Sequence, residues 1–217
     1  MRSFLRLKNR RPGWLPDAFR DADLRYAEEL VALFVQRYTR QGDVVLDPFA
    51  GYGTTLVVAE GLGRAAYGVE ADAARAAYAR SRLALPERLI HGDTRRLLDY
   101  PLPPFDLAMS SPPFMERSDR ENPLRGEPCG PEGYAEYLDD LRQIGALLAR
   151  RMRPGARVVL ELSNLKGPEG ITTLAWDAAQ ALSAVLRFEG EVVIGWDRYD
   201  YGYDHSYCLV FSALEEP

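Results

Sequence analysis

The sequence predicts a doubly wound α/β fold: a Rossmann-like, mostly parallel sheet with helices on both faces and an antiparallel final strand. The first observation is that short apolar segments alternate with segments of helical periodicity between residues 44 and 109. The second is that the chain closes on two apolar segments with no helix between them, 191–196 and 205–213. Alternation calls for a parallel sheet, whereas two strands joined directly pair antiparallel.

Length and composition favour a single domain over residues 1–217. The chain has 217 residues, of which 47% are apolar and 27% charged, and domains commonly hold about 100–200 residues. No apolar run approaches the roughly 18 residues of a membrane span, and the basic N-terminus lacks the apolar segment of a signal peptide. We therefore expect a cytoplasmic protein without membrane association. The net charge of −5 leaves nucleic-acid binding open, because binding surfaces are local.

The first half of the chain is expected to form an N-terminal arm followed by alternating elements. Residues 1–23 predict an irregular arm because Pro12, Gly13 and Pro16 interrupt them. Apolar residues at helical spacing then predict a helix over 24–38. The predicted elements that follow are strand 44–47, helix 54–62, strand 64–70, helix 71–84, strand 88–91 and strand 105–109.

The second half opens with a polar segment, 115–131, which is longer than a usual connection and is therefore predicted to be an active-site loop. Arg117, Arg120 and Arg125 in this loop are candidates for phosphate contacts. The acids between them allow a solvated mixed-charge surface instead. The remaining predicted elements are helix 134–151, strand 157–162, turn 167–170, helix 171–186 and strands 191–196 and 205–213.

A glycine-containing turn follows the first predicted strand, in the segment Phe49–Gly53. Glycine there permits positive φ and a close approach of backbone to a ligand. Asp47 would stand at the carboxyl end of that strand, and Glu70 at the end of the next, where a carboxylate can accept the ribose hydroxyls of a nucleoside. Asp93 follows the third strand and is a candidate acceptor for an adenine amino group, with helix N-capping as the alternative.

The glycine pattern distinguishes between two nucleoside cofactors. A nicotinamide enzyme requires a third glycine and a diphosphate at the helix N-terminus. Here Leu56 stands where that glycine would be, and Thr54 and Thr55 begin the helix. The sequence therefore favours S-adenosylmethionine over NAD. No structural zinc site is expected, because Cys129 and Cys208 form no CxxC pattern.

Ser111–Phe114 follows the predicted strand 105–109 and opens at the same edge of the sheet. Two consecutive prolines remove backbone donors and leave carbonyls that only accept. Hydrogen bonds from an amine to the Ser111 hydroxyl oxygen and the Pro112 carbonyl would localise the nitrogen lone pair, and Phe114 would stack on the base. A rigid turn after a strand is the alternative interpretation. The functional one predicts catalysis by positioning and electrostatics.

The order of these two segments resembles that of the S-adenosylmethionine-dependent DNA amino-methyltransferases, the cytosine-N4 and adenine-N6 enzymes. The resemblance is strong over residues 24–113 and reaches the last strand, 205–211. It implies methyl transfer to the exocyclic amino group of a nucleobase, with DNA favoured over RNA. Serine before Pro-Pro is typical of cytosine-N4 enzymes, whereas Asp or Asn is typical of adenine-N6 enzymes and of several RNA or glutamine amino-methyltransferases.

The same resemblance implies a role for individual residues. The implied catalytic residues are Ser111, Pro112, Pro113 and Phe114. The implied cofactor-binding residues are Tyr26, Asp47, Pro48, Phe49, Ala50, Gly51, Gly53, Thr54, Thr55, Glu70 and Asp93. No metal ligand is implied.

Two features depart from the family. Phe114 stands where a tyrosine is usual, which keeps the stacking ring and loses the hydroxyl. Restriction-type members also carry a sizeable target-recognition region, for which this chain offers only the N-terminal arm, loop 115–131 and loop 197–204. The alternatives are therefore an amino-methyltransferase of tRNA or rRNA bases, and a cofactor-binding subunit that needs a target-recognition partner. Association as a homodimer is also left open.

Overall fold

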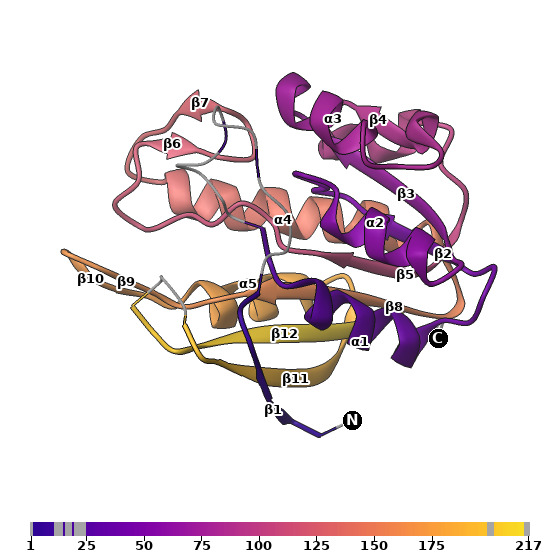
Figure 1. Ribbon diagram of the computed structural model, residues 1–217. Helices are drawn as coiled ribbons and strands as arrows, with labels where there is room; N and C mark the ends of the chain where they lie inside the picture. The colour runs from indigo at the N-terminus through magenta and orange to yellow at the C-terminus, as the bar shows by residue number, and fades with distance from the viewer. Residues whose placement is uncertain (1, 11–14, 16–18, 20–24, 199–201, 215–217) are drawn as a thin grey trace.

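The computed structural model describes residues 2–10, 15, 19, 25–198 and 202–214. Their central feature is an eight-stranded sheet with the order β1-β11-β12-β8-β5-β2-β3-β4 (Figure 1). The strands of this sheet are β1 (Phe4–Leu7), β2 (Val44–Asp47), β3 (Ala65–Glu70), β4 (Leu89–His91), β5 (Phe105–Ser110), β8 (Met152–Leu162), β11 (Arg187–Trp196) and β12 (His205–Ser212).

Strand direction confirms the predicted doubly wound fold. Strand β12 is antiparallel to both of its neighbours, β8 and β11. The other pairings in the described sheet are parallel. The chain runs outward from β2 through β3 to β4, then returns to β5 on the other side of β2. Ligands of such sheets bind at this reversal, outside the carboxyl ends of the strands.

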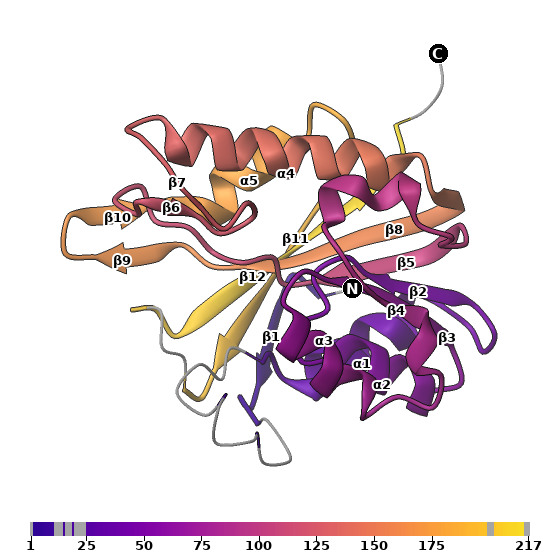
Figure 2. The same cartoon turned by 90° about the horizontal axis from the view of Figure 1, so that it is seen from above.

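Helices cover both faces, as predicted. Figure 2 shows α4 (Gly133–Ala149) and α5 (Leu174–Leu182) on one face and α1 (Glu28–Tyr38), α2 (Thr54–Gly61) and α3 (Ala73–Arg80) on the other. Alternate residues of each strand therefore enter two separate apolar cores. Strand β2 illustrates this, because its residues 44 and 46 join the core under α4 and α5 and its residue 45 joins the other. Two short 3₁₀ helices, η2 (Pro86–Arg88) and η3 (Thr94–Asp99), flank β4.

The expectation of an irregular arm over residues 1–23 is wrong for its first described part. Residues Phe4–Leu7 form β1, which pairs in parallel with β11 from Phe4↔Val193 to Leu7↔Trp196. The closing strand pair therefore does not form the edge of the sheet, because β1 covers β11. Edge pairing depends on backbone hydrogen bonds that any residue except proline can make, so the composition of the arm did not reveal it. Residues 1, 11–14, 16–18 and 20–23 of the arm lie outside the described residues.

Two other segments contain small hairpins that the sequence did not predict. The predicted active-site loop, 115–131, holds β6 (Glu121–Asn122) and β7 (Glu127–Pro128). The predicted turn 167–170 joins β9 (Leu165–Gly167) to β10 (Gly170–Thr172). The prediction of a helix from residue 171 is therefore wrong at its start, since α5 begins at Leu174. The Asn164 side chain accepts a hydrogen bond from the Ala175 backbone N–H at 3.1 Å in the first turn of that helix.

Helix boundaries shift elsewhere by a few residues. Helix α1 begins at Glu28 instead of residue 24, and α3 spans Ala73–Arg80 instead of 71–84. The Asp72 side chain caps α3 by accepting from the Arg75 backbone N–H at 2.8 Å. Within the described ranges no helix is long and apolar enough to cross a membrane.

Candidate active site

The residues predicted to hold a cofactor lie at the carboxyl ends of β2 and β3. Asp47 ends β2, Glu70 ends β3, and the loop after β2 passes between them into α2. In this loop Gly51 has φ +53° and Gly53 has φ +81°, conformations that residues with a side chain rarely adopt. A Cβ on Gly53 would lie 3.0 Å from the Cβ of Ala79, so glycine also lets α3 pack against the loop.

The Glu70 carboxylate connects the glycine loop to the segment after β3. Its Oε2 accepts from the Gly51 backbone N–H at 2.7 Å, and its Oε1 accepts from the Asp72 backbone N–H at 2.8 Å. The side chain is largely buried, with 8% of the residue exposed. Each carboxylate oxygen has two lone-pair sites, so acceptor capacity remains for two ribose hydroxyls. The carboxylate is thus held in place before any ligand arrives.

A direct hydrogen bond joins the two segments that the sequence singled out. The Ser110 hydroxyl donates to Asp47 Oδ1 across 63 residues of sequence. The same oxygen accepts from the Phe49 backbone N–H at 3.1 Å. Burial raises the pKa of Asp47 to about 6, against the opposing effect of the hydrogen bonds from Ser110, Thr55 and Phe49. The end of β5 and the glycine-containing loop after β2, which we call the cofactor loop after its predicted role, therefore share one buried carboxyl group.

The raised pKa of Asp47 predicts a pH-dependent stability. Because the folded protein binds the Asp47 proton more tightly than the unfolded chain, this site costs stability as pH rises from about 4 to about 6. A rise from the ordinary 3.8 to about 6 corresponds to roughly 3 kcal/mol at neutral pH. We expect Asp47→Asn to gain stability relative to the native protein as pH rises through this range, as measured by urea unfolding between pH 4 and 8.

Asp139→Asn is the control for that experiment. Hydrogen bonds from Arg142 and Gln143 lower the pKa of the exposed Asp139, so its removal acts in the opposite direction. A difference between Asp47→Asn and the native protein that stays constant across the pH range would contradict the assignment to Asp47.

Tyr26 lies beside the same buried carboxyl group. Its hydroxyl is hydrogen-bonded to the Thr55 hydroxyl at the start of α2. Burial is the main cause that raises the pKa of Tyr26, and the charges of Asp47 and Glu161 add to it. Tyr26 therefore stays neutral and lies between the cofactor loop and the end of β8. Thr54, which precedes Thr55 in the first turn of α2, is buried. Ala50 in the loop before this helix is buried as well.

Asp93 makes the contacts of a helix cap. It precedes η3 and accepts from the Arg95 backbone N–H at 2.8 Å. The Arg95 side chain also binds both carboxylate oxygens, and these hydrogen bonds lower the pKa of Asp93 against the effect of its partial burial. The next residue, Thr94, donates to the Pro48 carbonyl in the cofactor loop. The capping alternative is thus realised, and Asp93 still lies next to the cofactor loop through Thr94.

Ser111 contacts a residue that the sequence did not single out. Its hydroxyl donates to Glu161 Oε2 at 3.0 Å, which leaves the Ser111 oxygen lone pairs free to accept. Glu161 stands near the carboxyl end of β8 and is buried, with 3% of the residue exposed. The sequence signal was available, since Glu161 is the one charged residue in the predicted strand 157–162 besides Arg157 at its start.

The two proline carbonyls differ in their partners. The Pro113 carbonyl accepts from the Tyr137 hydroxyl of α4 at 2.8 Å, which anchors the turn to the helix. No hydrogen bond from the described residues reaches the Pro112 carbonyl. Phe114 is half-buried and packs against the core under α4. The Ser111 hydroxyl oxygen and the Pro112 carbonyl are therefore acceptors held at fixed positions beside the cofactor loop.

Two of the three candidate phosphate contacts in loop 115–131 are engaged in ion pairs. Arg117 pairs with Asp177 of α5 at 2.9 Å and lies over the Tyr134 ring. Arg125 pairs with Asp140 of α4 at 2.7 Å. These two arginines therefore fasten the loop to α4 and α5, and their partners are acids of the two helices instead of the acids between them in the loop. Arg120 is exposed and forms no ion pair with the other described residues. None of the described residues forms a His, Cys, Asp and Glu cluster suited to a metal ion.

Comparison with known proteins supports the sequence resemblance. Residues 21–81 match the family model described as DNA methylase. The Type II methyltransferase M2.DpnII of Streptococcus pneumoniae is 45% identical over 56 residues, which cover 26% of this chain and 21% of that protein. A release factor glutamine methyltransferase of Gloeobacter violaceus is 33% identical over 94 residues, which cover 40% of this chain and 33% of that protein. The chain thus matches about a fifth and a third of the length of these two relatives.

Solved structures extend the likeness to nearly the whole chain. The TehB-like SAM-dependent methyltransferase from Corynebacterium glutamicum superposes with a TM-score of 0.58 at 17% identity, covering 91% of this chain and 93% of that one. At this identity the match speaks for the fold alone. The chain therefore has the Rossmann-like fold seen in that methyltransferase, and its residues 21–81, which include the glycine loop, are similar to the DNA methylase family.

Proposed function

We propose that this protein is an S-adenosylmethionine-dependent methyltransferase that acts on the exocyclic amino group of a nucleobase, cytosine N4 in DNA. The observation that carries the proposal is the pair of acceptors on one turn, the Ser111 hydroxyl oxygen and the Pro112 carbonyl. They lie at the carboxyl edge of β5, and Ser110 joins that edge to the cofactor loop through Asp47. In this proposal the chain acts as one domain, in the cytoplasm.

The described residues fit the proposed cofactor. Among the described residues, a Cβ on Gly51 would meet only the Phe49 carbonyl, at 3.9 Å, which leaves room beside the loop backbone for a nucleoside. Glu70 would accept the ribose hydroxyls, with Asp93 near the adenine and Tyr26 and Asp47 near the methionine moiety. The cofactor residues proposed are those that the resemblance implied. S-adenosylmethionine supplies a methyl group on a sulfonium, which an amine lone pair can attack.

The residues of the chain have to prepare that lone pair. An amino group on a nucleobase is a poor nucleophile because its lone pair is delocalised into the ring. Ser111 and the Pro112 carbonyl would each accept one amine proton, which favours a pyramidal nitrogen. Glu161 keeps the Ser111 proton turned away, so the serine oxygen presents lone pairs to the amine. Phe114 would hold the base by stacking, and no covalent intermediate is required.

Substrate choice rests on two supports. Ser111 before Pro-Pro is the residue typical of the cytosine-N4 enzymes that the sequence resembles, and the matching family model is described as DNA methylase. The test is nucleoside mass spectrometry of DNA and RNA, incubated separately with the purified protein and S-adenosylmethionine. N4-methylcytosine in DNA is the expected product. Methylation of tRNA or rRNA alone would contradict the DNA assignment and support an RNA base methyltransferase. Methylation that requires a partner added from lysate would support the alternative of a cofactor-binding subunit.

A variant of Glu161 tests the orientation of Ser111. Glu161→Gln keeps the shape of the side chain and removes its charge, so the serine oxygen becomes a weaker acceptor. Hydrogen bonds to charged groups contribute roughly 1.5–3 kcal/mol, and we expect kcat to fall roughly 10-fold or more with the cofactor Kd unchanged. The readouts are single-turnover methyl transfer and calorimetry with S-adenosylhomocysteine.

The chain offers a matched control. Glu189 accepts from the Ser212 hydroxyl at 2.6 Å at the opposite end of the sheet, so Glu189→Gln changes a similar Ser–Glu pair away from the site. A Glu161→Gln protein with the native kcat would show that the charge of Glu161 has no part in methyl transfer.

A further inference from the structure

A row of aromatic side chains lies beside the proposed active site, on the face of the sheet that carries α5. The side chain of Trp176 of α5 lies near the Tyr207 hydroxyl. That hydroxyl lies 3.1 Å from His205 Nε2, and the His205 ring is 5.2 Å from the ring of Tyr203. Lys166 of β9 places its Nζ 3.9 Å from the centre of the Tyr203 ring. The row thus runs from Trp176 of α5 across β12 to the ammonium group of Lys166 in β9.

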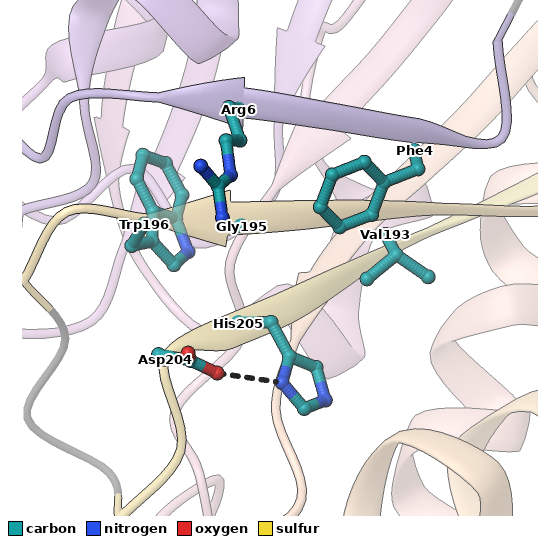
Figure 3. A pocket seen from close by; sticks show the side chains of 7 residues that line it. All are labelled: Phe4, Arg6, Val193, Gly195, Trp196, Asp204 and His205. Carbon is teal, nitrogen blue, oxygen red and sulfur yellow. Dashed lines mark hydrogen bonds and ion pairs between the residues drawn. The ribbon is translucent and has the colours of Figure 1, made fainter.

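Strand β1 forms the other side of this surface. Figure 3 shows Phe4 and Arg6 of β1 above a hollow whose floor is Val193 and Gly195 of β11, with His205 of β12 below. The pairing of β1 with β11 places these side chains together, because Phe4 pairs with Val193 and Arg6 pairs with Gly195. We call the seven residues on this surface the aromatic face: Phe4, Arg6, Lys166, Trp176, Tyr203, His205 and Tyr207.

Exposure sets these side chains apart from an ordinary core. Phe4 is 53% exposed and Trp176 58% exposed, so more than half of each ring-bearing residue is in contact with solvent. The hollow beside Phe4 has a volume of about 190 Å³, below the roughly 300–1,000 Å³ of sites that enclose a small molecule. The surface therefore suits part of a larger ligand that lies across it.

The charges on the aromatic face identify that ligand. Among the described residues, no carboxylate forms an ion pair with Arg6 or Lys166. Acids near the face include Asp204, which approaches His205 Nδ1 at 3.4 Å, and Glu191. Asp177, next to Trp176, is paired with Arg117. Exposed rings that alternate with unpaired cations are the features by which proteins bind single-stranded nucleic acid, since bases stack on the rings and phosphates contact the cations.

The aromatic face is continuous with the edge that carries Ser111. Tyr207 pairs with Leu162 on this face. The residue before Leu162 is Glu161, which holds the Ser111 hydroxyl and pairs with Cys208 on the opposite face of the same strand end. The Ser163 hydroxyl contacts the His205 carbonyl at 3.4 Å. The row therefore begins within a few residues of the proposed catalytic turn, at the same edge of the sheet.

We propose that the aromatic face binds unpaired nucleotides of the substrate strand, next to the base whose amino group is methylated. This inference rests on the function proposed above and adds the surface that holds the substrate strand. The face includes strand β1, which the sequence did not predict.

Binding of a fluorescently labelled single-stranded DNA of roughly 16 nucleotides, followed by anisotropy with saturating S-adenosylhomocysteine, tests the proposal. Trp176→Ala and Phe4→Ala are each expected to raise the Kd roughly 5- to 100-fold, and Trp176→Phe should recover most of the affinity. Arg6→Gln should reduce the slope of log K against log salt by about 0.7. The matched control is Phe188→Ala, an aromatic residue 39% exposed at the other end of β11, which should bind as the native protein does.

The outcomes separate this inference from the proposed function. Native affinity in both Trp176→Ala and Phe4→Ala, with cofactor Kd and melting temperature preserved, would overturn the aromatic face and leave methyl transfer intact. If the native protein methylates no nucleobase but these variants lose its DNA binding, the aromatic face is supported as a DNA-binding surface and the proposed methyltransferase function is overturned. Absence of DNA binding in the native protein, with a change of sedimentation in the variants, would assign the face to contact between copies of the chain and contradict the proposal.

Discussion

Replacing Ser111 with alanine is expected to lower the rate of methyl transfer by roughly 10²–10³-fold, the usual effect of removing one positioned polar group from a reacting centre. The variant removes an acceptor for the amine proton and the hydrogen bond that Ser111 donates to the buried Glu161. The cofactor loop is held by other bonds, chiefly those of Asp47 and Glu70, so the Kd for S-adenosylhomocysteine should stay unchanged. Tritium transfer from labelled S-adenosylmethionine to duplex DNA measures the first quantity and calorimetry the second.

Ser212→Ala is the matched control for this experiment. It removes a serine that also donates to a glutamate, Glu189, but at the end of β12 away from the site. Its rate should equal that of the native protein. If Ser111→Ala retained the native rate, the hydroxyl would have no role and Ser111–Phe114 would be a rigid turn, the alternative that its sequence allowed.

The second large effect is expected at Glu70. Glu70→Ala removes the carboxylate that holds the Gly51 and Asp72 backbone N–H groups and, in our proposal, two ribose hydroxyls. Hydrogen bonds to charged groups contribute roughly 1.5–3 kcal/mol each, so losing two of them predicts a Kd for S-adenosylhomocysteine raised by roughly 10²-fold or more. Glu70→Gln should fall between this variant and the native protein, because the amide keeps one acceptor oxygen.

Glu60→Ala is the matched control, because it also removes a glutamate whose carboxylate accepts a hydrogen bond from a backbone N–H. Glu60 accepts from the Ala84 backbone N–H at 2.9 Å in an exposed position behind the loop. It should change the cofactor Kd little. An unchanged Kd in Glu70→Ala, with the fold intact by circular dichroism, would place the nucleoside elsewhere.

The sequence predicted most of the fold because the relevant signals are local. Alternating periodicity identified the strands and helices between residues 44 and 109, and the directly joined last two strands indicated the antiparallel pair. The glycine loop could be predicted in the same way, because glycine is the residue that readily adopts positive φ. The structure has φ of +53° at Gly51 and +81° at Gly53. The carboxyl-edge location of Asp47, Glu70 and Ser111 followed from their places after strands.

Contacts between distant segments were not predictable in the same way. Glu161 meets Ser111 across 50 residues of sequence, and only the neighbouring positions of β5 and β8 bring them together. Strand β1 was assigned to an irregular arm because an edge strand leaves little mark on composition. Arg117 and Arg125 were candidate phosphate contacts until the positions of α4 and α5 showed the acids that pair with them.

Sequence alone was enough to predict the parallel strands β2 to β5, the antiparallel closing pair, the glycine loop and the serine–proline turn at the carboxyl edge. Tertiary structure alone decided that Asp47 and Ser110 share a hydrogen bond, that Glu161 orients Ser111, and that an aromatic face continues the same edge. The physical reason is that backbone conformation and periodicity depend on neighbouring residues. Pairs of side chains from different strands depend on strand order and register, which only the folded sheet sets.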